Sequence, residues 1–242
     1  SCAILLYFSP IPRKFRRDRT SLLDILKFGS GVSLNDVLWY LSSNIDYLFI
    51  SRYLSPTALG LYSRAADITR QPQDRFSNVL SSVLFPAYSR MQENRELMGR
   101  IYLKGVDIVS IVTFPLLAGI AVSSEYFVLG IYGENWSGAI AALQILCVAG
   151  MLKAVSHLAG AITHATGRIY SEVRRQALYA CSLVILSFYG VRYGIEGMGV
   201  AVVLSSLLFY LLMAHCVINI LGIRWSSFFM AQRTGTILAL IV

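Results

Sequence analysis

The sequence predicts an all-α fold, a polytopic bundle of transmembrane helices with six complete spans and a truncated helix at each end. Hydrophobic residues make up 56% of the 242 residues, charged residues make up 14%, and the mean hydropathy is +0.61. The surface of a soluble globule cannot be built from the polar residues that remain. The net charge of +8 comes from basic residues at the ends of apolar segments. This placement indicates membrane lipids as partners and argues against nucleic acid.

The six spans are expected at about residues 28–54, 56–90, 106–123, 139–163, 176–191 and 198–221, and the second of them is the most polar. Pro56 is well placed to begin the second helix, and Pro72 and Pro86 should kink it, because each removes a backbone donor. The four cysteines lie in or beside apolar spans without a CxxC spacing, which indicates packing rather than disulfides or a metal site.

Both ends are expected to be cut helices of a longer protein. The chain opens inside the apolar run CAILLYF without an initiator Met, and it closes with TILALIV, which is too short to span. We therefore expect a truncated helix and a basic cytoplasmic loop at 1–27, a six-helix lobe at 28–223, and a cytoplasmic loop leading into another truncated helix at 224–242.

The loops alternate in charge, and this alternation predicts the topology. Most of the 21 Lys and Arg residues fall in the loops of one side, which should be cytoplasmic. The six helices would then form three hairpins that open to the outside near Pro56, Asn135 and Gly194. The predicted location is the bacterial inner membrane, with several passes.

Polar side chains follow one face of each of the first two spans. The first span carries Asn35, Trp39, Ser42 and Asp46, and the second carries Arg64, Asp67, Gln71, Asp74, Arg75 and Asn78. These positions share a face at 100° per residue. Because lipid offers no hydrogen-bond partners, we expect both faces to turn toward each other or toward a water-filled cavity. These residues are the candidate substrate-binding site.

A purely structural interpretation of the same stripe is also open. Arg64 and Asp67 stand three residues apart, so they could form an intrahelical pair that makes a buried helix tolerable. A charge at the bilayer centre costs roughly 2.5–3.5 kcal/mol on insertion scales, however, so several charges in one helix favour function. Arg52 is expected to extend to the headgroups, and Arg70 fits either interpretation.

The fourth span contains one basic residue near its middle, Lys153, on a face shared with His157. We interpret both as cavity residues, with Lys153 a phosphate ligand or proton relay; the alternative for Lys153 is pairing with an acid in a missing lobe. His157 and His164 share a face, but no Cys, Asp or Glu completes a metal set, so packing or pH sensing remain their other roles.

One run carries a family signature: NIDYLFISRYLSPTALGLYSRAADITRQPQDRFSNVLSSVLFPAYSRMQ. Its order of N-x-D, I-x-R-x-L, LG-x-Y-x-x-A and VLFP-x-x-S-R resembles that of Wzx-like bacterial polysaccharide-export flippases. The runs FPLLAGIAVSSEYFVLGIYGENW and ALQILCVAGMLKAV look like the next two helices of that group. The resemblance covers roughly residues 26–223 and indicates the polysaccharide transporter branch of the multidrug/oligosaccharidyl-lipid/polysaccharide (MOP) exporter superfamily. Residues 55–57, Ser-Pro-Thr, replace an expected Gly- or Ala-rich turn.

The resemblance implies two six-helix lobes that face each other across a central cavity, with this chain as the second lobe. It implies a transporter, not an enzyme, which moves undecaprenyl-pyrophosphate-linked oligosaccharide to the outer leaflet by alternating access. The products would be exopolysaccharide, lipopolysaccharide or capsule. Polysaccharide polymerase and chain-length machinery are the implied protein partners.

The candidate residues suit this chemistry. Arg binds phosphate oxygens bidentately and stays charged at any depth. Asn and Trp can hydrogen-bond and stack on sugars. No cofactor is expected beyond a coupling ion, proton or sodium, which Asp46, Asp67 and Asp74 could bind. The alternatives are an ion-coupled multidrug-type exporter of the same superfamily and a membrane-embedded polysaccharide polymerase.

Overall fold

The structure is a computed structural model that describes residues 19–91 and 94–242. All the regular structure in these residues is helical, as the sequence predicts. The run CAILLYF and the basic residues at 13–17 lie outside the described residues, so the predictions made for them stay predictions.

The first predicted span is two helices rather than one. α2 (Arg19–Ser42) ends two residues before α3 (Ile45–Tyr53) begins. The side chain of Asn44 donates to the carbonyl oxygen of Tyr40 at 2.7 Å, and Asn44 N donates to Leu41 O at 3.1 Å, which tightens the backbone. These local hydrogen bonds compete with the regular helical pattern. The prediction of one continuous helix over 28–54 is therefore wrong at Ser43 and Asn44, and α2 also starts earlier than residue 28.

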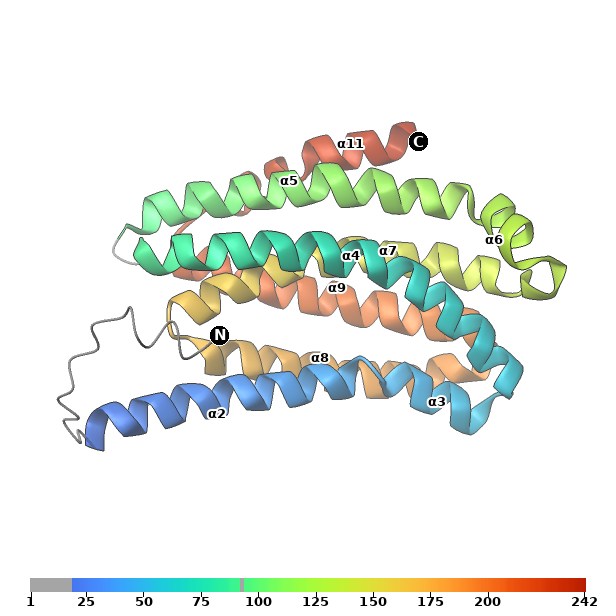
Figure 1. The fold of residues 1–242 in the computed structure, drawn as a ribbon, viewed down its shortest axis with the longest axis horizontal. Helices are drawn as coiled ribbons and strands as arrows, with labels where there is room; N and C mark the ends of the chain where they lie inside the picture. The colour runs from blue at the N-terminus through green and yellow to red at the C-terminus, as the bar shows by residue number, and fades with distance from the viewer. Residues whose placement is uncertain (1–18, 92–93) are drawn as a thin grey trace, which may run out of the picture.

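The second predicted span is one helix, α4 (Pro56–Arg90), with the predicted bounds. Ser55 caps it by accepting a hydrogen bond from Ala58 N at 3.1 Å, and Pro56 occupies the first turn, where no backbone donor is needed. The helix continues through Pro72 and Pro86 but bends partway along its length (Figure 1). A proline in a helix interior is a common cause of such a bend.

The middle of the chain forms α5 (Arg95–Val122), α6 (Ser124–Tyr132), a short 3₁₀ helix at Glu134–Trp136 and α7 (Ala139–Ala165). α5 begins well before the predicted residue 106, because Asn94 caps it by accepting from Leu97 N at 3.0 Å. The segment expected to be an outer loop contains α6 instead. α7 starts as predicted.

The last part forms α8 (Ile169–Gly190), a 3₁₀ helix at Val191–Tyr193, α9 (Gly194–Leu221), α10 (Trp225–Ala231) and α11 (Arg233–Ile241). α8 begins before the predicted residue 176, and α10 occupies much of the segment expected to be a loop after residue 223. Gly194 and Gly222 have positive φ at the turns on either side of α9. Glycine reaches this backbone conformation without a steric cost.

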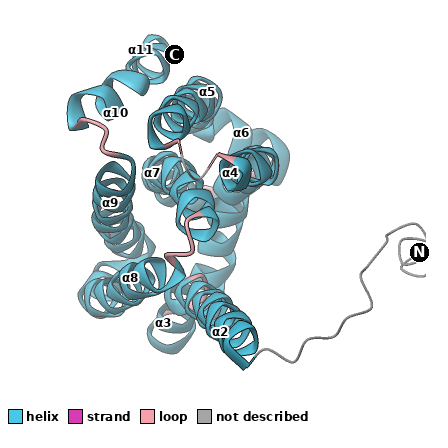
Figure 2. Ribbon diagram, turned by 90° about the vertical axis from the view of Figure 1, so that its left-hand side faces the viewer, coloured by secondary structure: helices cyan, strands magenta, loops and turns pink. Residues whose placement is uncertain are grey.

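α7 is the central helix of the bundle. It packs against α4, α5 and α9, while α8 joins α9 to α2 on one side and α11 covers α5 on the other (Figures 1 and 2). One apolar core lies around Tyr102, Leu158 and Val217. A second surrounds Tyr62 and Leu143 toward the other end of α7.

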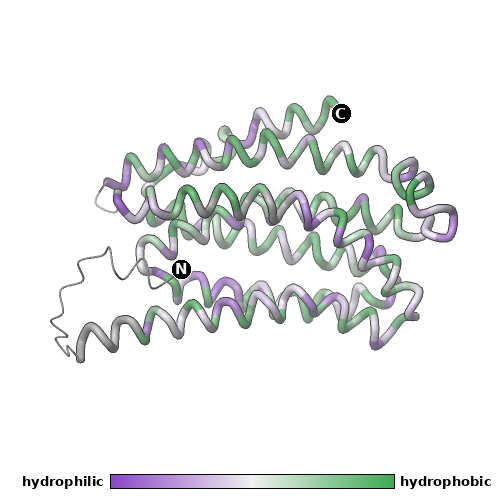
Figure 3. Tube along the Cα trace, viewed as in Figure 1, coloured by the Kyte–Doolittle hydropathy of each residue, from purple (hydrophilic) through white to green (hydrophobic). Residues whose placement is uncertain are grey.

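Three segments of the described chain are long and apolar enough to cross a bilayer: Arg95–Val122, Ala139–Ala165 and Ile169–Leu221. The last of these folds as the pair α8 and α9. Much of α5 is hydrophobic, whereas hydrophilic segments lie partway along α4 as well as near the ends of the helices (Figure 3). The protein is thus a helical membrane protein, and the total of six spans stays a prediction.

Candidate functional site

A polar cavity of about 140 Å³ lies among α2, α4, α7, α8 and α9. It brings together five of the residues that the sequence proposed, and it adds others that the sequence analysis did not select. The predicted lining residues are Asn35, Trp39, Ser42, Lys153 and His157. The additional lining residues are Ser43, Arg70, Ser156, Gly160, Glu172, Gln176, Tyr179, Phe209 and Met213.

Lys153 provides a positive charge on the cavity wall. It projects from α7 and is half-buried, with Nζ 6.0 Å from the ring centroid of Tyr179, close enough for a weak cation–π contact. No acid forms an ion pair with Lys153 in the described part of the chain. Its charge therefore remains available to an anionic ligand.

Arg70 adds a second positive charge, but internal partners hold it. Its Nη2 lies 3.6 Å from Asp46 Oδ2 and donates to the carbonyl oxygen of Ser43 at 3.0 Å. Its guanidinium also lies 5.1 Å from the ring centroid of Tyr47. These contacts link α4 to α3 and to the break between α2 and α3.

Asp46 is the buried partner in this group. It is 4% exposed, and its carboxylate accepts hydrogen bonds from Tyr62 Oη at 2.9 Å and from Tyr47 N at 3.0 Å. A buried carboxylate requires such donors, because burial removes its water. A smaller cavity lined by Asp46, Arg70 and Lys153 lies beside this cluster. Asp46 thus fixes Arg70 in place rather than lining the main cavity.

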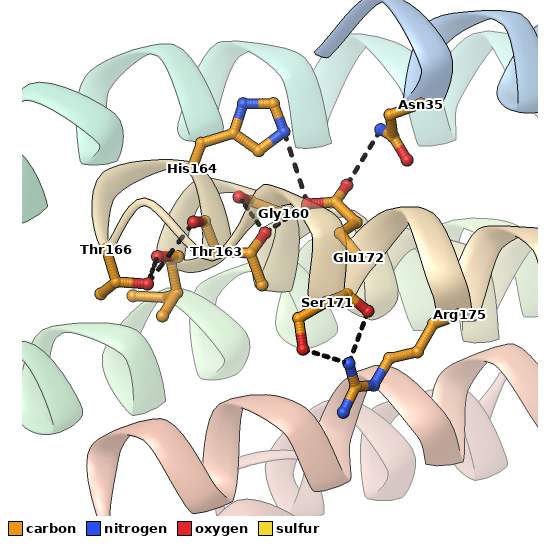
Figure 4. A network of polar contacts seen from close by, with 9 residues as sticks. Asn35, Gly160, Thr163, His164, Thr166, Ser171, Glu172 and Arg175 are labelled. Atoms are coloured by element: carbon orange, nitrogen blue, oxygen red, sulfur yellow. Dashed lines mark hydrogen bonds and ion pairs between the residues drawn. The ribbon is translucent and has the colours of Figure 1, made fainter. Parts of the chain in front are cut away.

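Glu172 holds three helices together at another part of the cavity wall (Figure 4). From α8, its Oε1 accepts from Asn35 Nδ2 of α2 at 3.3 Å. Its Oε2 accepts from Thr163 Oγ1 of α7 and lies 3.4 Å from His164 Nε2 of the same helix. Glu172 and Gln176 stand one turn apart on α8 and are both buried.

One of the two amides on this wall, Asn35, keeps unused hydrogen-bonding capacity. Gln176 Nε2 donates to Ser42 Oγ at 3.3 Å. Asn35 Oδ1 is buried and has no hydrogen-bond partner among the described residues. Buried polar atoms are nearly always paired in native proteins, so an unpaired one at a cavity wall is a candidate ligand contact.

The remaining predicted residues lie elsewhere or cannot be placed. Arg64, Asp67 and Gln71 are exposed on α4 and do not line this cavity. The side chains of Asp74, Arg75 and Asn78 are outside the described side chains. A second lobe would be needed to cover the exposed stripe, so its role in the site stays a prediction.

The sequence analysis missed Glu172 and Gln176 because it placed the start of the fifth span at residue 176. A helix that begins at Ile169 puts both residues on one face, and this spacing was the available signal. Arg70 lies off the polar stripe of α4, so periodicity alone could not assign it to the cavity. Among the described residues, no three His, Cys, Asp or Glu side chains come together as metal ligands.

The chemistry of this cavity suits an anionic ligand that also carries hydroxyl groups. Lys153 supplies charge, the amides of Asn35 and Gln176 supply hydrogen-bonding groups, and Trp39 and Tyr179 supply aromatic faces.

Comparison with known proteins agrees with the membrane fold. A family model described as "Polysaccharide biosynthesis protein" matches residues 1–141. The lipopolysaccharide biosynthesis protein WzxC of Escherichia coli K12 is 32% identical over 144 residues, which is 60% of this chain and 29% of that protein. The teichuronic acid biosynthesis protein TuaB of Bacillus subtilis 168 is 28% identical over 168 residues, 68% of this chain and 35% of that protein. The chain thus spans about a third of the length of these relatives.

The fold also occurs in a solved structure, the lipid II flippase MurJ in an inward closed conformation. The TM-score is 0.75 with 16% sequence identity, and the match covers 99% of this chain and 53% of that one. The family match extends over more than half of the chain and includes the run that carries the sequence signature. The chain therefore belongs to the polysaccharide biosynthesis protein family, as the resemblance of its sequence to the polysaccharide-export group indicated.

Proposed function

We propose that this chain is one lobe of a flippase that moves undecaprenyl-pyrophosphate-linked oligosaccharide units across the bacterial inner membrane. The units would serve the synthesis of exopolysaccharide, lipopolysaccharide or capsule. Family membership and the fold shared with about half of a lipid II flippase support the proposal. The lobe would alternate its access together with a second lobe, which is not part of this chain.

The observation that carries the proposal is the cation of Lys153, which has no acidic partner among the described residues, inside a polar cavity of a membrane lobe. A charge at such a site is costly, so it is retained where a ligand or function uses it. A pyrophosphate group provides the opposite charge. Arg70 adds to the positive potential, although Asp46 offsets much of its charge.

The alternatives fit this cavity less well. A multidrug-type exporter would bring organic cations against Lys153, which electrostatic repulsion disfavours. A polymerase would need reactive acids or bases on a sizeable outer loop, and no observation in the described residues favours one. The coupling ion, proton or sodium, stays a prediction.

The proposal is tested by complementation of a bacterial strain that lacks its polysaccharide flippase, using the full-length protein. We expect Lys153→Ala to abolish or greatly reduce surface polysaccharide at normal membrane abundance, and Lys153→Arg to retain part of the activity because it keeps the charge. Arg192→Ala is the matched control, since Arg192 is exposed against Phe188 and Tyr189 outside the cavity. Full activity of Lys153→Ala would contradict the proposed role of the cavity.

Complementation with Arg64→Ala tests the exposed stripe of α4 separately. Loss of polysaccharide at normal abundance would place Arg64 in a cavity shared with the other lobe. Full activity would make the stripe a structural feature of the lobe surface.

A further inference from the structure

The polar cavity has two chemically different ends, and α7 sets the distance between them. Lys153 lies at one end. Gly160 lies two turns further along α7, about 10 Å away, where a Cβ would stand 3.2 Å from Glu172 Oε1. Glu172 in turn holds Asn35. The cavity therefore runs from a cationic end to an end lined by an amide and a carboxylate.

Asn35 shows what the second end can bind. The residue is only 9% exposed, and its Nδ2 already donates to Glu172. Its Oδ1 lacks a partner among the described residues. Leaving a buried acceptor without a hydrogen bond costs free energy, so a ligand that donates to this oxygen would be favoured. A sugar hydroxyl is such a donor, and both the hydroxyl and the amide oxygen of Asn35 are uncharged.

Trp39 supplies the other half of a sugar-binding arrangement. It lies one turn after Asn35 on the same face of α2, lines the cavity and is 47% exposed. A large exposed aromatic face beside hydrogen-bonding amides matches a pyranose ring, which presents C–H groups on its faces and hydroxyl groups around its edge. Gln176, buried on the neighbouring α8, adds a second amide.

We propose that this end of the cavity binds the sugar joined directly to the phosphate of the lipid-linked substrate. The phosphate would lie at Lys153, and the first sugar ring would lie against Trp39 with a hydroxyl donating to Asn35 Oδ1. The cavity volume of about 140 Å³ is on the scale of one sugar ring rather than an oligosaccharide. The inference rests on the proposed function and makes Asn35 and Trp39 specificity residues.

Binding to two lipids tests the inference with the full-length protein in nanodiscs. One probe is undecaprenyl pyrophosphate without sugar. The other is the lipid-linked repeat unit extracted from a flippase-deficient strain of the same bacterium. The unaltered protein should bind the glycosylated lipid about thirtyfold more tightly, because one hydrogen bond and one ring contact together contribute about 2 kcal/mol.

Substitutions should separate the two ends. Asn35→Ala and Trp39→Ala should lose most of the preference for the glycosylated lipid while still binding the sugar-free lipid, which also shows that they fold. Trp39→Phe should keep part of the preference, and Trp136→Ala, outside the cavity, should keep all of it. Lys153→Ala should weaken binding of both lipids.

The outcomes distinguish this inference from the proposed function. If the unaltered protein binds neither lipid, the proposed function fails, and the inference fails with it. If it binds both lipids equally, or if Asn35→Ala and Trp39→Ala keep the preference, only the sugar site is overturned.

Discussion

Arg70 of α4 donates a hydrogen bond to the carbonyl oxygen of Ser43, the residue at which α2 breaks from α3. The same guanidinium lies 3.6 Å from Asp46 on α3. One side chain therefore satisfies a backbone acceptor released by the break and neutralises a buried acid next to it. The geometry of the break depends on a residue from another helix.

Arg70→Ala should destabilise the protein, because it leaves the carboxylate of Asp46 buried without a cation. Removing one partner of a buried pair costs 3–5 kcal/mol, but Arg70 is partly exposed, so we expect about 2 kcal/mol. The measurement is thermal unfolding of the full-length protein in detergent. Asp46→Ala should cost less in the Arg70→Ala background than in the unaltered protein, and additive losses in the double variant would contradict the coupling.

Tyr62→Phe and Tyr88→Phe form a matched pair of predictions, because both tyrosines are fully buried. Tyr62 Oη donates to Asp46 at 2.9 Å, whereas Tyr88 Oη has no partner among the described residues. Tyr62→Phe should cost about 2 kcal/mol, the typical value for a hydrogen bond to a charged group. Tyr88→Phe should be neutral or stabilising. Equal shifts in unfolding temperature for the two variants would contradict the hydrogen-bond assignment.

Two helix starts followed from local signals in the sequence. Ser55 and Pro56 correctly placed the start of α4, and the apolar run after Gly138 placed the start of α7. The break at Ser43 and Asn44 was missed because the apolar pattern continues on both sides of it. Capping by Asn94 extends α5 into a charged segment that hydropathy assigned to a loop.

The cavity was only partly predictable, because it depends on which helices are neighbours. Asn35, Trp39 and Ser42 were found by their shared face, and Lys153 by its isolation in an apolar span. Glu172 lies beside them because α8 packs on α2. The periodicity of the sequence does not show which helices are neighbours. Arg64, Asp67 and Gln71 follow the same kind of stripe yet lie on the outside of the lobe, since a polar face does not specify its partner.

Gly190→Ala should disturb the close approach of α8 and α9 beside the turn that connects them. A Cβ on Gly190 would stand 2.6 Å from the backbone carbonyl oxygen of Gly197, and neither backbone can move without shifting its helix. We expect a loss of about 1–3 kcal/mol, the usual cost of overpacking. Gly60→Ala is the control, because nothing lies within 4 Å of its added Cβ and alanine favours the helix. Thermal unfolding should separate the two variants, and an unchanged Gly190→Ala would contradict the close approach.

Glu172→Ala and Glu172→Gln distinguish hydrogen bonding from charge at the junction of α2, α7 and α8. Alanine leaves the amide of Asn35 without its one described hydrogen-bond partner, and an unpaired buried donor costs about 1–3 kcal/mol. Glutamine keeps an oxygen that can accept from Asn35, and its amide nitrogen can donate to the hydroxyl of Thr163 in place of accepting from it. It loses the ionic contact with His164, so its unfolding temperature should fall less than that of Glu172→Ala. Adding Asn35→Leu to Glu172→Ala should recover stability, because the unpaired amide is removed together with its lost acceptor. If Glu172→Gln destabilises as much as Glu172→Ala, and Asn35→Leu recovers nothing, the carboxylate acts through its charge rather than by joining α2 to α8.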